Sequence, residues 1–390
     1  MHARNARDDS GPVTLLLMIA AACLLLANLY YPQPILGEVA RALRLPEAAS
    51  GAVITAGQLG YIAGLLLVAP LGDIRENRRL CAAMTAGAGL CALAAGGTAS
   101  APLFLLLMAL MGVFATATQV LVVFATALAG PGRSGKVLGI MACGLFLGIA
   151  LSRPVAGLVA GAAGWRAVYL GSGLALICTG LCLSRFLPTR APAQERLSWR
   201  ALVASLWPLL RFPLLLRRTL LSCGAFFSFS MFWSTVPLYL AGHLNVAQGR
   251  ITAFALAGLV RPPCMLLVGK LLDRGLGRRI LLAALGCGVL AWLLPLAGAA
   301  WLGVFMVSAL LLDPSSSAVT VSIQQRILSG APQEVRGQLN SLNISMNFLG
   351  DAAGAALGPF VLAHCGLAAV LLSGALLLGS LLCLAAASRW

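Results

Sequence analysis

Charged residues are scarce in this sequence: only 10% of its 390 residues are Asp, Glu, Lys or Arg. Soluble domains carry about 25% charged and about 45–50% apolar residues. Here 60% of the residues are hydrophobic and the mean hydropathy is +0.94. No soluble fold covers that much apolar surface. The low charge therefore excludes an ordinary soluble domain and predicts an all-α polytopic membrane protein.

Histidine is rarer still. The three histidines, His2, His243 and His364, lie in the N-terminal tail or near the predicted ends of membrane spans, which excludes a bis-histidine haem inside the bundle. The eleven cysteines show no metal or disulfide spacing, and we interpret them as small buried hydrophobic residues. The predicted loops contain no P-loop, nucleophile–base pair or metal-ligand cluster. The sequence therefore predicts no enzyme, no ATP-driven pump, no cofactor and no metal.

Long apolar runs fill the chain. A membrane-spanning helix needs roughly 20 consecutive apolar residues, and we cut the sequence at its charged, proline and glycine clusters. Twelve runs of sufficient length remain. We predict transmembrane helices at 14–34, 50–71, 79–98, 102–128, 136–161, 166–186, 218–241, 250–272, 279–298, 301–325, 338–362 and 366–387.

The positive charge is placed asymmetrically along these spans. The net charge is +16, and with the N-terminus inside, only Arg41, Arg44, Arg166 and Arg250 fall in outer segments. An excess of Lys and Arg on the cytoplasmic side orients membrane proteins. The pattern predicts a multi-pass protein of the bacterial inner membrane with both termini cytoplasmic. Because orientation accounts for the charge, the sequence implies no nucleic-acid partner.

A charged motif occurs twice. Residues 69–80 read APLGDIRENRRL and residues 269–280 read GKLLDRGLGRRI. The tripeptide Phe-Leu-Gly also recurs, at 146–148 and 348–350. Such recurrence indicates an internal repeat. We predict an N-terminal six-helix bundle at 1–186, a basic and proline-rich cytoplasmic linker at 187–217, and a C-terminal six-helix bundle at 218–390.

The doubled motif resembles the loop between helices 2 and 3 of the major facilitator superfamily. The matching residues are Gly72, Asp73, Arg78 and Arg79, and in the second copy Gly269, Asp273, Arg274, Gly277, Arg278 and Arg279. Ile74 departs from the pattern, because a basic residue is usual there. NLYYPQP at 28–34 and GWRAVY at 164–169 resemble the bacterial drug- and metabolite-efflux branch. The resemblance implies two pseudo-symmetric six-helix bundles, alternating access, a small-molecule substrate, protons as partners and a monomer.

A mechanical role follows for the motif. An aspartate at a helix end accepts from free backbone N–H groups or pairs with arginines of the other half. Such pairs would form when the cytoplasmic side closes and break when it opens. We predict conformational gating by Asp73, Arg78, Arg79, Asp273, Arg274 and Arg278. The alternative is that these residues only follow the positive-inside rule.

Four ionisable residues lie deep in predicted spans: Arg153, Arg261, Asp313 and Asp351. An unpaired charge there costs at least ~2.5–3.5 kcal/mol on insertion scales, so a function is expected. Polar stripes accompany both acids, with Asn340, Asn343 and Asn347 before Asp351, and with Ser317, Thr320 and Gln324 after Asp313. We predict that Asp351 first, and Asp313 second, carry the coupling proton. Permanent salt bridges and a structural hydrogen-bond network are the alternatives.

The remaining candidates are substrate-binding residues. We predict this role for Arg153, Arg261, Asn28, Tyr31, Trp233 and Asn347, although Trp and Tyr also gather at membrane interfaces. Pro262 and Pro263 should break the eighth span at mid-depth. The sequence favours a proton-coupled exporter of a drug-like compound or a metabolite such as a siderophore, sugar or amino-acid derivative. The alternatives are an importer or uniporter of an organic anion that uses the two arginines, and a receptor.

Overall fold

All the apolar runs form helices. The computed structural model describes residues 12–68, 71–129, 133–189, 213–329 and 336–387, and these contain no strand. Of the predicted linker at 187–217, residues 187–189 and 213–217 are described, and a helix already begins at Pro213; residues 190–212 lie outside the described part.

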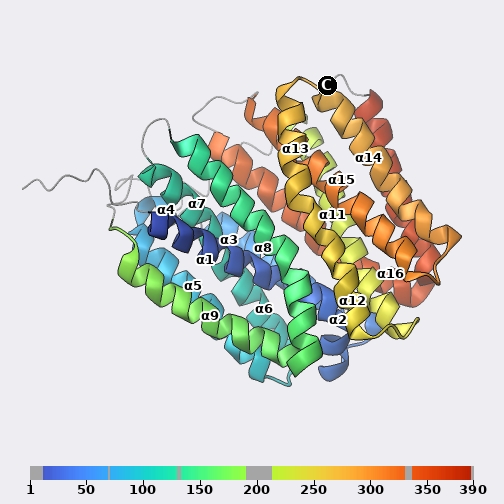
Figure 1. Ribbon diagram of the computed structural model, residues 1–390, viewed down its shortest axis with the longest axis horizontal. Helices are drawn as coiled ribbons and strands as arrows, with labels where there is room; N and C mark the ends of the chain where they lie inside the picture. The colour runs from blue at the N-terminus through green and yellow to red at the C-terminus, as the bar shows by residue number, and fades with distance from the viewer. Residues whose placement is uncertain (1–11, 69–70, 130–132, 190–212, 330–335, 388–390) are drawn as a thin grey trace, which may run out of the picture.

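The helices of the first half run from Pro12 to Phe186 and are drawn in blue to green in Figure 1. Two of the predicted spans, the first and the fourth, are each built from two helices joined by a slight break. The elements are α1 (Pro12–Tyr30), α2 (Pro32–Ala42), the 3₁₀ turn η1 (Glu47–Ala49), α3 (Ala52–Leu67), α4 (Leu71–Ile74), α5 (Asn77–Gly97), α6 (Ala101–Ala115), α7 (Ala117–Leu128), α8 (Ser134–Ala163) and α9 (Trp165–Phe186).

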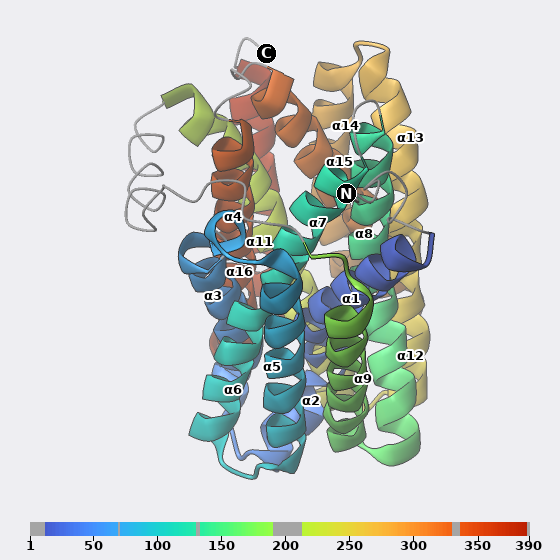
Figure 2. The same ribbon diagram turned by 90° about the vertical axis from the view of Figure 1, so that its left-hand side faces the viewer.

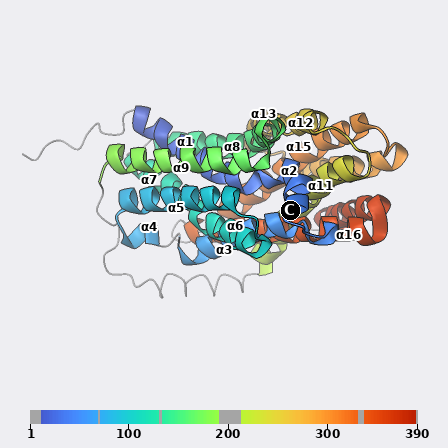
Figure 3. The same ribbon diagram turned by 90° about the horizontal axis from the view of Figure 1, so that it is seen from below.

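The helices of the second half are drawn in yellow to red and lie beside the first half (Figures 1 and 3). The elements are α11 (Pro213–Gly242), α12 (Gln248–Ala255), the 3₁₀ segment η3 (Leu256–Val260), α13 (Arg261–Asp273), α14 (Gly277–Leu293), the 3₁₀ turn η4 (Leu294–Ala297), α15 (Leu302–Ser329) and α16 (Arg336–Ala387).

The predicted number of spans is confirmed. Eleven helical stretches in the described residues are long and apolar enough to cross a membrane, and the last of them runs over 49 residues, Leu339–Ala387. At 1.5 Å per residue that is more than twice the hydrocarbon thickness. Its backbone breaks at Gly366, where φ is 77° and ψ is 175°. α16 therefore holds the eleventh and twelfth spans.

The first span is longer than predicted. We expected it to end at residue 34 because of two prolines, but the chain continues as α2 to Ala42. Pro32 and Pro34 occupy the first turn of α2, where a missing N–H costs nothing. As a result, the segment NLYYPQP lies inside the bundle and not near its outer end, and Tyr30 and Gln33 are fully buried.

The cysteines are less uniformly buried than predicted. Cys81 and Cys91 are buried, but Cys143, Cys178 and Cys287 lie on the outer surface of the bundle. That surface also carries many leucines, among them Leu158 and Leu376. On a membrane protein it faces lipid, where a thiol is tolerated as a small apolar group.

The repeated Phe-Leu-Gly tripeptide makes equivalent contacts in the two halves. A Cβ added at Gly148 would lie 2.5 Å from the carbonyl oxygen of Cys23 in α1. A Cβ added at Gly350 would meet the carbonyl of Cys223 in α11. Thus α8 packs on α1 as α16 packs on α11. The helices of the first half also stand side by side in Figure 2, where α5 lies between α6 and α9.

We expect Gly350→Ala to destabilise the protein by about 1–3 kcal/mol, because the backbones of two helices must move apart. Gly379→Ala is the matched control: its added Cβ has nothing within 4 Å. The unfolding temperature of the purified protein in detergent measures both. Equal unfolding temperatures for the two variants would contradict the close approach of α11 and α16.

The two halves meet chiefly where α3 packs on α16, where α2 packs on α11, and where α8 packs on α12 and α13. Near one end of the bundle, Thr55 donates to the carbonyl of Ala352 at 3.0 Å and Gln248 donates to the carbonyl of Pro34 at 3.2 Å. We call this the joined end. The repeated charged motif lies at the opposite end, at residues 71–79 and 273–279.

Candidate functional site

The four ionisable residues predicted in the membrane are all buried, with side chains at most 1% exposed. Arg153 comes from α8 in the first half. Arg261, Asp313 and Asp351 come from α13, α15 and α16 in the second half. Their side chains therefore face the interior of the bundle and not lipid.

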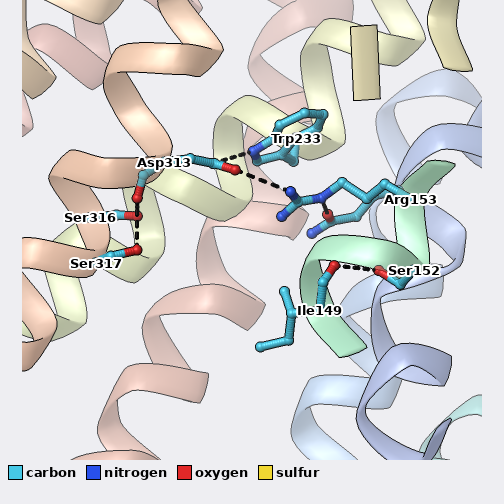
Figure 4. A network of polar contacts seen from close by, with 8 residues as sticks. Ile149, Ser152, Arg153, Trp233, Asp313, Ser316 and Ser317 are labelled. Carbon is cyan, nitrogen blue, oxygen red and sulfur yellow. Dashed lines mark hydrogen bonds and ion pairs between the residues drawn. The ribbon is translucent and has the colours of Figure 1, made fainter. Parts of the chain in front are cut away.

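Arg153 and Asp313 form an ion pair between the two halves. Nη1 of Arg153 lies 3.2 Å from Oδ2 of Asp313, and Nε donates to Oε1 of Gln33 at 2.8 Å. The other carboxylate oxygen accepts from Nε1 of Trp233 at 2.8 Å. The guanidinium also stacks 4.0 Å above the indole ring. Figure 4 shows Asp313 reaching both partners, so this pair is held from several sides.

The local sequence makes room for this pair. α12 ends at Ala255, and the chain continues as a 3₁₀ segment until α13 begins at Arg261. Pro262 and Pro263 lack the N–H groups of a continuous helix, so the predicted break in the eighth span is confirmed. The segment carries Gly258, at which a Cβ would lie 2.5 Å from Nη1 of Arg153 and 3.2 Å from Oδ2 of Asp313.

Asp351 is held less completely than Asp313. Its Oδ2 accepts from the hydroxyl of Tyr30 at 3.0 Å, which also joins the two halves. Its Oδ1 has no well-formed hydrogen bond among the described residues, and the hydroxyl of Ser230 lies beside the carboxylate as a weak donor. Arg153 and Arg261 are its charged neighbours. Asp351 is therefore the carboxylate with free hydrogen-bonding capacity.

Arg261 is surrounded by aromatic rings. Its guanidinium carbon lies 4.5 Å from the ring centre of Phe229, 5.8 Å from Phe226 and 6.0 Å from Phe146. Phe229 also contacts Arg153, at 4.8 Å, so one ring separates the two cations. In the described part of the chain no carboxylate lies within 4.0 Å of Arg261, and its Nε and Nη1 have no hydrogen-bond partner.

Three other predicted substrate residues lie away from these charges. Asn28 donates to the carbonyl of Leu24 and accepts from Ser172, within the first half. Asn347 accepts from Ser222 at 2.7 Å, within the second half. Tyr31 is buried, but its neighbour Tyr30 is the tyrosine that reaches Asp351.

The polar stripes are partly joined to each other. Gln324 of α15 donates to Asn340 of α16 at 2.7 Å, and Asn343 accepts from Ser222 of α11 at 3.2 Å. These bonds agree with the alternative stated above, in which the polar stripes form a structural hydrogen-bond network between helices. The side chains nearest the middle of the bundle, Asp313 and Asp351, are the ones that contact the first half.

The residues of the repeated motif show mostly local contacts. Arg79 pairs with Glu76 at 2.9 Å, and Arg278 donates to the carbonyl of Ala386 at 2.9 Å. Asp273 and Arg274 are exposed, and Arg78 is partly exposed. The side chain of Asp73 lies outside the described residues. The described part of the motif contains no ion pair between the halves, so gating stays a prediction.

Among the described residues, no group of three His, Cys, Asp or Glu side chains lies close enough together to hold a metal ion. The central site therefore consists of two arginines, two aspartates, a tyrosine, a glutamine and a wall of aromatic rings. It can bind charged groups and it can exchange a proton. Two of its contacts, Arg153–Asp313 and Tyr30–Asp351, cross the interface between the halves, so separation of the halves at this depth must break them.

Comparison with known proteins identifies the family. The model of the Major Facilitator Superfamily matches residues 17–355. The putative uncharacterized transporter YgaY of Escherichia coli K12 is 34% identical over 374 residues, covering 94% of this chain and 93% of that protein.

Solved structures share the fold. A mutant of the nucleoside transporter NupG covers 96% of this chain and 98% of its own, with a TM-score of 0.73 at 14% identity. The human organic anion transporter MFSD10 covers 96% of this chain and 100% of its own, with a TM-score of 0.71 at 17% identity. Since the family model spans most of the chain, this protein belongs to the Major Facilitator Superfamily of membrane transporters.

Proposed function

We propose that this transporter exports a small organic molecule in exchange for protons. The observation that carries the proposal is Asp351, a carboxylate that is completely buried, holds one hydrogen bond across the halves and keeps one oxygen free. When the halves move apart, Tyr30 leaves Asp351 and the carboxylate meets water. A proton is then taken up on one side and released on the other. Asp313, with its ion pair and indole donor, is the second candidate for the proton.

The topology links this cycle to a direction. We place the joined end outside, because the positive-inside rule puts the repeated motif and both termini in the cytoplasm. The described state would then be closed toward the outside. Protons that enter down their gradient would release the substrate from Asp351 on the outer side. Like other members, the chain would act as a monomer in the bacterial inner membrane.

Everted membrane vesicles test the direction. Vesicles energised by respiration should accumulate candidate compounds against a gradient, and nigericin should abolish this accumulation by collapsing the pH difference. Vesicles of cells that lack the protein are the control. Concentrative uptake seen only in right-side-out vesicles would contradict export.

A second function is favoured by one observation. Arg261 lacks a carboxylate partner within 4.0 Å among the described residues, and a cation in this position attracts an anion. The fold relative MFSD10 is named an organic anion transporter. Uptake or uniport of an organic anion would use Arg153 and Arg261 together. The vesicle experiment separates this candidate from export by the direction of accumulation.

Gating by the repeated motif gives a further prediction. Asp73→Asn should leave the amount of protein in the membrane unchanged but slow transport about 5-fold or more, because it weakens one conformational state by roughly 1 kcal/mol or more. Asp273→Asn is the equivalent change in the second copy. Initial rates of transport per unit of protein in everted vesicles test this prediction. A wild-type rate in Asp73→Asn would remove the gating role.

A further inference from the structure

Arg261 and Asp351 are two buried opposite charges that do not pair with each other. Their side chains are 1% and 0% exposed, yet Nε and Nη1 of Arg261 and Oδ1 of Asp351 have no hydrogen-bond partner in the described residues. A buried polar atom without a partner costs about 1–3 kcal/mol, and more when it is charged. Native proteins rarely keep several such atoms together. These atoms therefore point to a ligand that supplies what is missing.

The two residues belong to one region of the site. The ring of Phe229 contacts Arg261 at 4.5 Å and packs edge-on against Tyr30 at 6.4 Å. Tyr30 in turn donates to Asp351. Arg261 acts electrostatically on both Tyr30 and Asp351. A cation and an anion with free hydrogen-bonding atoms are thus placed around the same aromatic wall.

The charges of the site select one class of ligand. Arg153 and Asp313 neutralise each other, which leaves one positive and one negative group. A simple anion would satisfy Arg261 and leave Asp351 unpaired, and a simple cation would do the reverse. A molecule that carries both charges satisfies both. The ring of Phe226 lies tilted against the rings of Phe229 and Phe348, with the centres 6.3 Å apart in each case, so the surroundings of the charges are apolar.

We propose that the substrate is an organic zwitterion with an apolar or aromatic body, of the amino-acid type. Its carboxylate binds the guanidinium of Arg261 and its ammonium group binds the free oxygen of Asp351. The body packs against Phe146, Phe226 and Phe229. This assignment rests on the proposed function and names the substrate class of the same site.

The assignment also accounts for exchange with protons. Asp351 faces Tyr30 of α1, Arg153 of α8 and Arg261 of α13, and the neutral Ser230 of α11 lies beside it. A proton and an ammonium group compete for this carboxylate, so each displaces the other, as antiport requires. A simple anion would instead bind best when Asp351 is protonated, and proton and substrate would then move together. The charge of the substrate thus sets the sign of coupling.

Three compounds with one carbon skeleton test the assignment. L-Phenylalanine is a zwitterion, phenethylamine keeps only the ammonium group, and 3-phenylpropionate keeps only the carboxylate. Binding to the purified full-length protein is measured by calorimetry, and the protons exchanged are counted from the dependence of the binding enthalpy on the buffer. Wild type should bind L-phenylalanine about tenfold or more tighter than either analogue and release protons.

Two variants should change the ranking in opposite ways. Arg261→Gln should no longer prefer L-phenylalanine to phenethylamine. Asp351→Asn should no longer prefer L-phenylalanine to 3-phenylpropionate. Arg261→Lys keeps the charge and should keep the wild-type ranking. If Arg261 and Asp351 had only a structural role, each variant would weaken the binding of all three compounds equally. Gel filtration and unfolding temperature confirm that each variant is folded.

The assignment is overturned if 3-phenylpropionate binds wild type most tightly and protons are taken up, if the variants leave the ranking unchanged, or if none of the three compounds binds. The everted-vesicle experiment separates this failure from failure of the proposed function. Concentrative, nigericin-sensitive accumulation of a neutral compound would keep proton-coupled export and discard the zwitterion. If no compound accumulates, export itself fails.

Discussion

Asp351→Asn is expected to abolish transport against a gradient, while exchange of substrate across the membrane continues at substrate concentrations high enough to offset weaker binding. Asparagine has nearly the same shape and still accepts from Tyr30, so the contact between the halves at 3.0 Å survives. What is lost is the group that gains and loses a proton. Concentrative accumulation in everted vesicles should fall to the level of vesicles without the protein. Counterflow of labelled substrate in de-energised proteoliposomes should continue.

Tyr30→Phe is the matched control for this variant. It removes the hydrogen bond across the halves but keeps the Asp351 carboxylate. Concentrative accumulation should therefore persist. If Asp351→Asn accumulates substrate as wild type does, Asp351 carries no proton, and the alternative of a purely structural contact holds.

Breaking the Arg153–Asp313 pair is expected to cause the largest loss of stability. Removing one partner of a buried ion pair leaves an uncompensated charge, which costs about 3–5 kcal/mol. Asp313→Asn and Arg153→Gln should each lower the unfolding temperature strongly. The double variant has no charge left to bury, and the new side chains can hydrogen-bond to each other, so most of the stability should return. Unfolding temperatures in detergent give this double-mutant cycle.

An exposed ion pair serves as the reference. Arg79 pairs with Glu76 at 2.9 Å, but the Arg79 side chain is 87% exposed. Exposed pairs contribute about 0–1 kcal/mol, so Glu76→Gln should leave the unfolding temperature almost unchanged. Additive losses in the Arg153→Gln and Asp313→Asn double variant would show that the two side chains do not depend on each other, against the geometry described.

The sequence predicts the helices well because lipid imposes a simple rule. Every span must be about 20 apolar residues long, and charges and prolines mark the ends. The exception is instructive. Pro32 and Pro34 looked like an end but open a new helical turn, and α2 continues to Ala42. Pro262 and Pro263 likewise stand in the first turn of a new helix, α13, which follows a 3₁₀ segment inside the eighth span.

The depth of Arg153, Arg261, Asp313 and Asp351 could also be predicted, since position along a helix follows from counting residues. Their pairing could not. Periodicity places side chains on a face, but it does not say which face of which neighbour lies opposite. The pairing of Arg153 with Asp313 instead of Asp351 depends on how the halves dock.

The same limit explains the tyrosine. Tyr30 and Tyr31 are adjacent in NLYYPQP and point about 100° apart on a helix, so one faces Asp351 and the other does not. We chose Tyr31 for the site, and Tyr30 makes the contact. Gly148 and Gly139 show this too: the first packs on α1, whereas the second has nothing within 4 Å of its added Cβ. In both pairs the difference depends on which helix lies opposite the residue, and the sequence alone does not give that.

Proton movement through Asp351 is the central claim, and one measurement tests it most directly. Everted vesicles are energised with a fluorescent pH probe present, and a compound that the transporter accumulates is added to wild type and to Asp351→Asn. We expect substrate-dependent proton efflux from the vesicles in wild type and none in the variant. Equal efflux in both would contradict it.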